Sequence, residues 1–172
     1  MKKYNHSFMI ARFQPFHKGH KSIIDKMLKN SKNITIILGS AQEYGTKRNP
    51  LDVTQRVKLI KNIYGKKENI KILSLNDIEC DSDEWYKHVI EFLEKEVPEF
   101  GPPDAYYCGD MENGKYYDKG DFKIELVNRE NQVGFKKTSA SEIREMITNH
   151  DDNWKNYIPK ENVKLIENFL YN

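Results

Sequence analysis

Short apolar runs alternate with longer amphipathic stretches along this chain, and this alternation restricts its fold more than any other feature. Short, mainly apolar runs of four to six residues predict buried strands, and the stretches between them have the spacing of helices with one apolar face. The predicted strands are Ser7–Ala11, Asn33–Leu38, Ile70–Leu75, Ala105–Cys108 and Lys123–Val127. The predicted helices cover about Lys18–Leu28, Asp52–Ile63, Glu84–Glu96, Ser139–Thr148 and Glu161–Leu170, with a shorter turn near Trp154–Ile158. Strands alternating with helices predict an α/β fold: a single Rossmann-like, doubly wound domain with a mostly parallel sheet and a C-terminal helical tail.

Length and charge limit the classes of partner. The chain has 172 residues, which we expect to form one domain over residues 1–172. Its net charge of +2 gives no argument for a nucleic-acid partner. Cys80 and Cys108 are too few for a disulfide framework, and the lysines near the N-terminus precede no long apolar segment. We therefore expect a cytoplasmic protein that binds neither nucleic acid nor membrane.

Residues 12–20 read Arg-Phe-Gln-Pro-Phe-His-Lys-Gly-His and stand between the first predicted strand and the first predicted helix. If the helix begins near His17, then His17 and His20 share one face close to free backbone N–H groups. Arg12 adds a permanent positive charge, and the N–H groups of its planar guanidinium match phosphate oxygens. Gly19 has no side chain and would let a ligand approach the backbone. A histidine pair at this spacing is also typical of a surface pair or part of a zinc site, but no Cys or carboxylate stands close enough in sequence to complete an obvious zinc set. The segment predicts a polyphosphate site with Arg12, His17 and His20 as candidate catalytic residues.

A second cluster, residues 138–144, reads Thr-Ser-Ala-Ser-Glu-Ile-Arg. Ser139 precedes Glu142 by three residues at the start of a predicted helix, which is the pattern of a capping box. Hydroxyls of Ser139 and Ser141 and free N–H groups would also bind phosphate, with Arg144 one turn inside as a second clamp. The two interpretations are compatible because a capped helix N-terminus is itself an anion site.

Loops that follow parallel strands meet at one edge of the sheet, where ligands of such folds bind. After the second strand, Gly39 and Ser40 are small enough for close backbone approach, although a simple turn is the commoner explanation of such a segment taken alone. The same loop continues to Lys47 and Arg48, which would close over a bound phosphate or form a solvated charge run.

The loop after the third strand is acidic. Asp77, Glu79, Asp81 and Asp83 have the oxygen donors of a divalent-metal site, but alternating acidic residues are usually a solvated loop, so we assign no protein metal ligand. Trp85, which follows, would stack on a cationic heterocycle or belong to the core.

These segments carry a family resemblance. Residues 12–20 resemble the HxGH signature of the nucleotidyltransferase superfamily, and residues 138–144 resemble its second, Ser/Thr-rich signature ending in Ile-Arg. Within the superfamily the chain is similar to the archaeal-type nicotinamide mononucleotide (NMN) adenylyltransferases. The further matching segments are Gly39-Ser40-Ala41-Gln42, Arg48-Asn49-Pro50 with Arg56, Asp77-Ile78-Glu79-Cys80, Tyr107-Cys108-Gly109, Trp154 and Ile158-Pro159. The departures are Ala11 and Ala140 in place of glycine, one extra residue within Asp81–Glu84, and no aromatic residue or threonine in Asn49–Asp52.

The resemblance implies NAD biosynthesis from ATP and NMN, with NAD and pyrophosphate as products, a divalent metal, usually Mg²⁺, and a homo-oligomer. It implies that the ATP phosphates are contacted by Arg12, His17, His20 and Arg144, with help from Ser139 and Ser141. The remaining implied binding positions are Arg48 for phosphate or substrate, Asp77 and Trp85 for the nicotinamide ring, Gly109 beside the adenine, and Gly19, Gly39 and Ser40 in the nucleotide-binding loops.

In the implied reaction the 5′-phosphate of NMN attacks the α-phosphorus of ATP. This nucleophile is anionic at pH 7, so positioning and charge stabilisation matter more than a strong general base. Two alternatives stay open at this point. One is a related enzyme with another acceptor or with CTP, such as a pantetheine-phosphate adenylyltransferase or a cytidylyltransferase. The other is a catalytically silent module that senses NAD or ATP.

Overall fold

The computed structural model describes residues 1–127 and 138–171, and in these residues five parallel strands form one sheet in the order β3-β2-β1-β4-β5. The strands are β1 (Tyr4–Ala11), β2 (Ser31–Leu38), β3 (Ile70–Ser74), β4 (Ala105–Cys108) and β5 (Lys123–Leu126). The α-helices are α1 (Lys18–Asn30), α2 (Val53–Tyr64), α3 (Ser82–Glu96), α4 (Met111–Gly114), α5 (Ala140–Thr148) and α6 (Lys160–Tyr171). Short 3₁₀ helices are η1 (Pro98–Phe100), η2 (Lys115–Tyr117) and η3 (Asp152–Tyr157).

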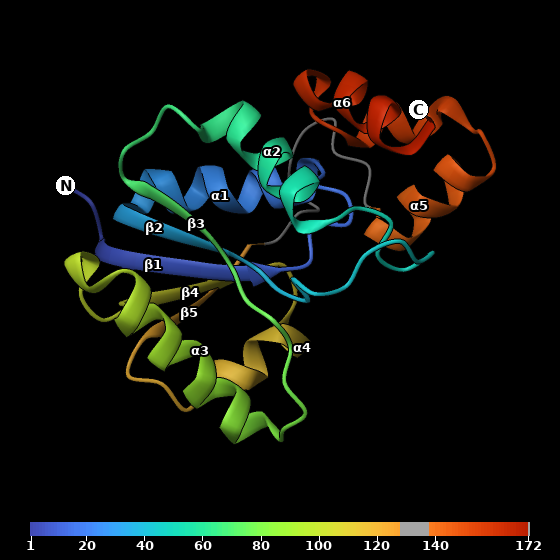
Figure 1. Cartoon of the computed structure of the whole chain (residues 1–172). Coiled ribbons are helices and arrows are strands. Elements are labelled where there is room, and N and C mark those ends of the chain that lie inside the picture. Colours follow the sequence, from blue (N-terminus) through green and yellow to red (C-terminus); the bar gives the residue numbers. More distant parts are fainter. Residues whose placement is uncertain (128–137, 172) are drawn as a thin grey trace.

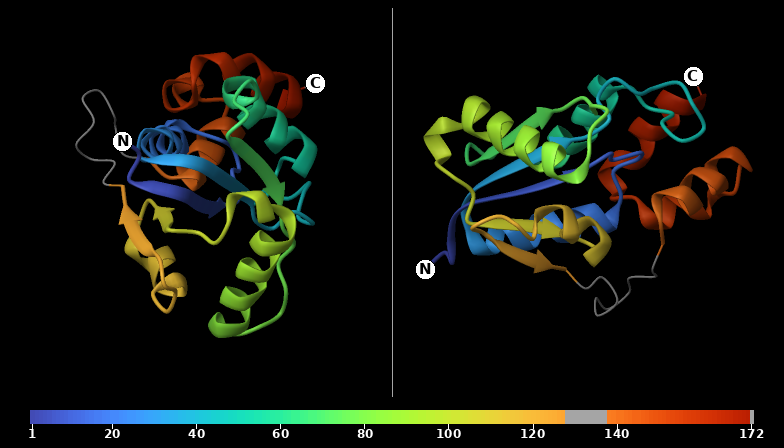
Figure 2. Two further views of the ribbon diagram at one scale, coloured as in Figure 1. Left: turned by 90° about the vertical axis from the view of Figure 1, so that its left-hand side faces the viewer. Right: turned by 90° about the horizontal axis from the view of Figure 1, so that it is seen from below.

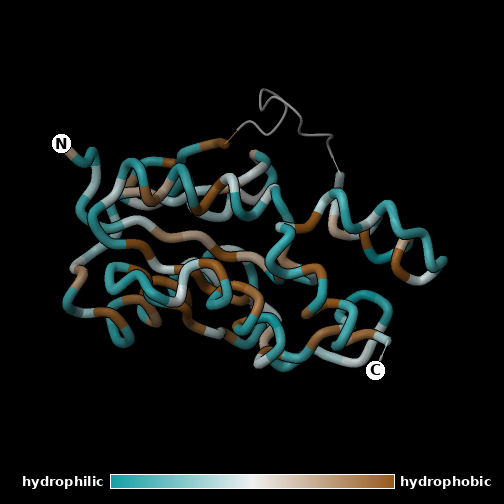
Figure 3. Tube along the Cα trace, turned by 90° about the horizontal axis from the view of Figure 1, so that it is seen from above, coloured by the Kyte–Doolittle hydropathy of each residue, from teal (hydrophilic) through white to brown (hydrophobic). Residues whose placement is uncertain are grey.

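Helices cover both faces of the sheet. In Figure 1, α1 and α2 lie on one face and α3 and α4 on the other, and Figure 2 shows the same layers from two further sides. Helices α5 and α6 lie at the end toward which the strands point. Hydrophobic positions recur along the helices with hydrophilic positions between them (Figure 3). This confirms the predicted α/β Rossmann-like class, here with every strand pairing parallel.

The largest difference among the strands is the start of β1, while β2, β3 and β5 differ from the prediction by one or two residues at one end. One short helix, α4, was not predicted. Strand β1 begins at Tyr4 rather than Ser7, and its polar residue His6 is buried: His6 bonds through Nδ1 to the carbonyl oxygen of Gly101 at 2.8 Å and through Nε2 to Oγ1 of Thr35 at 2.9 Å. Helix α4 has only four residues and had no apolar periodicity to predict it. Among the described residues, no helix is both long enough and apolar enough to span a bilayer.

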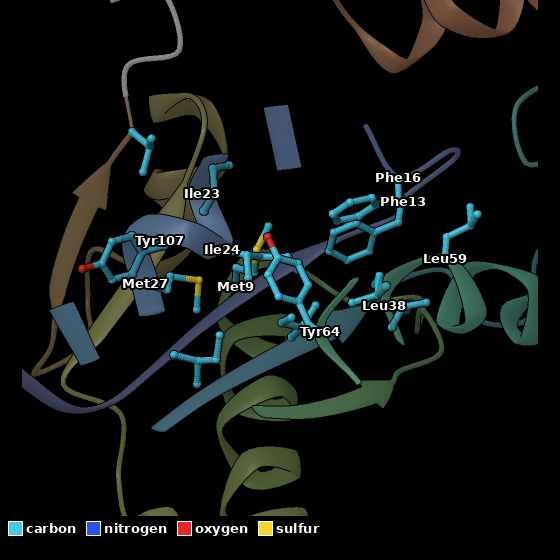
Figure 4. Packing of buried hydrophobic residues seen from close by; sticks show 14 of the residues in the cluster. Met9, Phe13, Phe16, Ile23, Ile24, Met27, Leu38, Leu59, Tyr64 and Tyr107 are labelled. Carbon is cyan, nitrogen blue, oxygen red and sulfur yellow. The ribbon is translucent and has the colours of Figure 1, made fainter. Parts of the chain in front are cut away.

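The larger core cluster lies between the sheet and the α1–α2 layer and extends into the loop after β1. Phe13 and Phe16 of that loop are buried beside Leu38, Leu59 and Tyr64 (Figure 4). Phe13 has φ +53°, a conformation that costs a bulky residue on the order of 1–3 kcal/mol. Burial of its ring against the core offsets this strain, so the loop between β1 and α1 has a fixed path.

Candidate active site

Two histidines cap helix α1 and also form the start of the site. Nδ1 of His17 accepts the N–H of Gly19 at 3.0 Å, and Nδ1 of His20 accepts the N–H of His17 at 3.4 Å. The ring centroids are 3.8 Å apart, which confirms that both rings lie on one face at the helix N-terminus. Because each Nδ1 accepts a main-chain hydrogen, the proton of each neutral ring is on Nε2. In such a ring Nε2 is the donor nitrogen.

Aromatic rings fix the orientation of His20. Its ring centroid is 4.7 Å from that of Phe13 and 6.0 Å from that of Phe16, and these two phenylalanines stack on each other at 6.0 Å. His17 is only 2% exposed, so it too is held by its surroundings. Side chains fixed in this way need little reordering when a charged ligand binds.

Arg144 joins the second cluster to the first. Its Nη1 donates to the carbonyl oxygen of Gln14 at 2.8 Å, across 130 positions of sequence, and its Nη2 donates to Oγ of Ser141 at 3.0 Å. The predicted capping box at the start of α5 is confirmed: Oγ of Ser139 accepts the N–H of Glu142, and the Glu142 carboxylate accepts the N–H of Ser139. The N-terminal turn of α5 therefore lies beside the loop that leads into α1.

Three arginines converge on this place. Burial, and then the positive charge of Arg48, lower the pKa of Arg12. Burial, and then the charges of Arg12 and Arg48, lower the pKa of Arg144. Nη1 of Arg12 also donates to Oδ1 of Asn49 at 3.4 Å, which connects it to the loop that carries Arg48. Guanidinium groups close enough to repel one another form a site that an anion would stabilise.

The loops after β2 and β3 meet at Asp77. Oδ1 of Asp77 accepts the N–H of Ser40 at 3.1 Å, and the N–H of Asp77 donates to Oε1 of Gln42 at 3.1 Å. The negative charge of Asp77 favours the charged form of Arg12 and so opposes part of the lowering of its pKa by burial. Ser40 has φ +48° and lies directly after Gly39, where an added Cβ would make only an ordinary 3.5 Å contact with Ile10. The fold itself therefore does not require glycine at position 39.

Trp85 and the acidic residues before it lie at the start of α3, where they cap the helix and pack against the core. Trp85 is half-buried and packs against a second core cluster that includes Val89, Leu93 and Tyr117. Its Nε1 donates to the hydroxyl of Tyr117 at 3.2 Å. Asp81 caps the helix by accepting the N–H groups of Asp83 and Glu84, while Asp83 pairs with Lys119. In the part of the chain that the structure describes, no group of three His, Cys, Asp or Glu side chains could hold a metal ion. Gly109 directly follows β4, at the same edge of the sheet as the other loops.

The sequence reasoning assigned no role to two buried polar side chains. Gln14 is 1% exposed and holds Leu51 through both main-chain groups: its Nε2 donates to the carbonyl oxygen at 2.7 Å and its Oε1 accepts the N–H at 3.0 Å. Arg56 is fully buried on the apolar face of α2. The sequence did indicate that Arg56 is unusual, because it precedes Leu59 and Ile60 by three and four residues. This spacing places a cation on the face of the helix that packs against the sheet.

A cavity of about 260 Å³ lies beside the arginines. Lys47 and Arg144 contribute its cationic wall, and Leu51, Ile147 and Leu170 contribute apolar surface. The cavity gives a ligand bound at Arg144 room to extend toward α6.

Known proteins resemble this chain over most of its length. Residues 8–146 match the cytidylyltransferase-like family. The nicotinamide-nucleotide adenylyltransferase of Methanococcus vannielii is 30% identical over 164 residues, covering 93% of this chain and 87% of the relative. The enzyme of the same name from Archaeoglobus fulgidus is 28% identical, with 94% and 90% covered.

A solved structure has the same fold. The bifunctional NMN adenylyltransferase/ADP-ribose pyrophosphatase of Francisella tularensis superposes with a TM-score of 0.77 and 25% identity. The match covers 90% of this chain but 45% of that protein. Together, these findings show that the chain belongs to the cytidylyltransferase-like family and, within it, to the nicotinamide-nucleotide adenylyltransferases.

Proposed function

We propose that this protein transfers the adenylyl group of ATP to the 5′-phosphate of NMN and forms NAD and pyrophosphate. Membership of the nicotinamide-nucleotide adenylyltransferases supports this activity. The observation that carries the proposal is the bond from Arg144 to the carbonyl oxygen of Gln14, because it brings the N-termini of α1 and α5 to one place. Two helix N-termini and three arginines form a field that suits a triphosphate opposite a second phosphate.

In the proposed mechanism an oxygen of the NMN phosphate attacks the α-phosphorus of ATP. The bond between the α-phosphorus and the bridging oxygen breaks, and pyrophosphate leaves with the electron pair. Arg12 and Arg144 hold the phosphate oxygens, and the Nε2–H groups of His17 and His20 donate to oxygens on which charge increases. Catalysis then consists of positioning two anions against their repulsion and stabilising the charge of the transition state.

Other contacts follow from the same geometry. We propose that Ser141 acts through Arg144, while Ser139 and Gly19 contribute the helix N-termini that face the nucleotide. Arg48 and Asp77 contact the acceptor side, together with the Gly39–Ser40 turn. Trp85 and Gly109 flank the two bases.

We propose that the metal is Mg²⁺ and that it enters with the nucleotide. The described residues have no protein cage for a metal, and Mg²⁺ commonly keeps phosphate and water ligands. A Francisella tularensis structure of the bifunctional enzyme was obtained with AMP and a manganese ion. The cation would reduce the repulsion between the phosphates when it is bound.

We also propose that residues 1–172 form one catalytic domain and that the protein acts in the cytoplasm as a homo-oligomer. Cys80 and Cys108 form no disulfide bond with each other, which suits a reducing compartment. Sedimentation at several protein concentrations tests the assembly.

Product formation by the purified protein tests the activity. Pyrophosphate release is followed with Mg²⁺ and ATP against NMN, deamido-NMN and pantetheine phosphate, and with CTP in place of ATP. We expect pyrophosphate and dinucleotide in equal amounts with a nicotinamide-type acceptor. Turnover only with pantetheine phosphate or only with CTP would assign the site to the related enzymes. Calorimetric binding of NAD without pyrophosphate release would instead indicate a sensor.

A further inference from the structure

Arg56 places a fully buried guanidinium group directly beneath the site. It is 0% exposed although it lies on the first turns of α2, and the hydrogen-bond partners found for it are carbonyl oxygens. Nη1 donates to Arg12 at 3.0 Å and Gly39 at 2.9 Å, Nη2 to Ser40 at 3.0 Å and Ala41 at 3.4 Å, and Nε to Asp52 at 3.4 Å. One side chain therefore connects the end of β1, the loop after β2 and the start of α2.

Burial of a cation in this position lowers the stability of the folded protein, so we expect it to have a role that accounts for it. Burying a charge requires several hydrogen bonds to replace its hydration, and a well-packed apolar side chain would avoid that cost. The carbonyl oxygens that Arg56 binds carry partial negative charge at the very edge where the phosphates are proposed to bind. The guanidinium satisfies these oxygens and adds a fixed positive charge below the anion site.

The groups that Arg56 holds are attached to site residues. Arg12, whose carbonyl oxygen it binds, has its own side chain bonded to Asn49. Ser40 is held from both sides, since its carbonyl oxygen accepts from Arg56 and its N–H donates to Asp77. This double attachment keeps Ser40 at its positive φ of +48°.

We propose that Arg56 is a positioning residue for adenylyl transfer: its guanidinium fixes the end of β1 relative to the loop after β2, and so sets the separation of Arg12 and Asp77. This role rests on the proposed function. A lysine cannot replace it, because one ammonium nitrogen cannot reach carbonyl groups that the guanidinium contacts through two separate nitrogens.

The test compares Arg56→Gln and Arg56→Lys with a matched control, Asn162→Ala. Asn162 is also fully buried and its Nδ2 donates to the carbonyl oxygen of Leu59 on α2 at 2.9 Å, but it lies on α6 and its bonds join α6 to α2 rather than to the loops of the site. All three variants lose a buried bond to a carbonyl oxygen and should have a lower Tm. Misplacement of a catalytic group by about 1 Å can cost about 100-fold in rate, so we expect kcat/KM to fall by about 100-fold in Arg56→Gln and about tenfold in Arg56→Lys. Most of the loss should be in kcat, whereas Asn162→Ala should keep kcat/KM within about twofold of wild type.

The outcomes separate the two proposals. A wild-type protein that forms pyrophosphate but no NAD overturns the proposed acceptor, and kcat/KM of the variants is then measured with the acceptor that reacts. A wild type without turnover on any acceptor overturns the proposed function and this role together. If the wild type is active and folded Arg56→Lys matches Asn162→Ala in kcat/KM, the positioning role is wrong. If neither Arg56 variant folds, Arg56 serves folding alone and the role is likewise wrong.

Discussion

The bond between Arg144 and Ser141 predicts that the serine acts through the arginine. Nη2 of Arg144 donates to Oγ of Ser141, while Nη1 is held independently by the carbonyl oxygen of Gln14. In Ser141→Ala the second bond still restrains the guanidinium, so the loss is that of one hydrogen bond, about 1 kcal/mol. At the transition state this corresponds to about a fivefold decrease in kcat/KM.

Arg144→Lys should have a much larger effect because it keeps the charge and loses the planar fork. An ammonium group cannot bond Gln14 and Ser141 and still present two donors to a phosphate. Removal of one preorganised donor costs about 3 kcal/mol, so kcat/KM should fall by about 100-fold. Adding Ser141→Ala to this variant should cost less than about twofold more, because the bond that the serine supports is already absent.

Initial rates of pyrophosphate release with ATP and NMN measure all four proteins of this double-mutant cycle, and thermal melting confirms that each is folded. Thr148→Ala is the matched control: it removes a hydroxyl on the same helix that bonds the carbonyl oxygen of Arg144 at 2.9 Å and not its guanidinium. It should leave kcat/KM unchanged. If Ser141→Ala costs the same factor with arginine and with lysine at position 144, the serine contacts the nucleotide directly and the reasoning is refuted.

Three further predictions follow from buried or capping side chains. His20→Ala removes a proposed phosphate donor and should lower turnover by about 100-fold, measured by pyrophosphate release, with the far-ultraviolet circular dichroism retained. Gln14→Ala leaves both main-chain groups of buried Leu51 without their partner and should lower the free energy of unfolding by about 2–4 kcal/mol, measured by urea denaturation. Burial lowers the pKa of His6, so below about pH 6.5 the unfolded chain binds a proton that the folded protein does not, and stability should fall as the pH decreases through that value. His6→Gln, melted in urea at the same pH values, should lack most of this dependence.

Each of these predictions has a clear contrary result. Near-normal turnover of His20→Ala would remove the histidines from the proposed mechanism. A loss below about 1 kcal/mol in Gln14→Ala would mean that water replaces the amide at Leu51. Equal pH dependence in wild type and His6→Gln would assign the acid sensitivity to other groups.

The alternation of strands and helices was predictable from sequence because apolar periodicity records which face of each element is buried. All five predicted strands are present, and the helices differ mainly at their ends. The start of β1 was missed since Asn5 and His6 are polar. Asn5 is exposed, and the burial of His6 depends on partners such as Gly101 that are distant in sequence. Hydropathy alone cannot report such a bond.

The candidate site was predictable to a similar extent. The histidine pair and the capping box of α5 depend on local spacing, and the structure confirms both. Gln14 and Arg56 bond main-chain groups that only the tertiary fold brings to them, so residue type and spacing did not identify their partners. Sequence analysis gave two interpretations of Trp85, a core residue or a ring that stacks on a heterocycle. Its contacts match the first, and its place beside a base is a proposal.

The strand order divides the candidate site between the middle of the sheet and one edge strand. Strand β1 is hydrogen-bonded to β2 on one side and to β4 on the other, whereas β3 forms one border of the sheet. The loop that we propose binds the phosphates follows the middle strand, and the loop with Asp77 follows the border strand. A graft or insertion after β3 would therefore leave the register of the inner strands untouched. If Asp77 contacts the acceptor as proposed, exchange of this one loop would change acceptor preference, in the laboratory or in evolution, without altering the loops proposed to bind the phosphates.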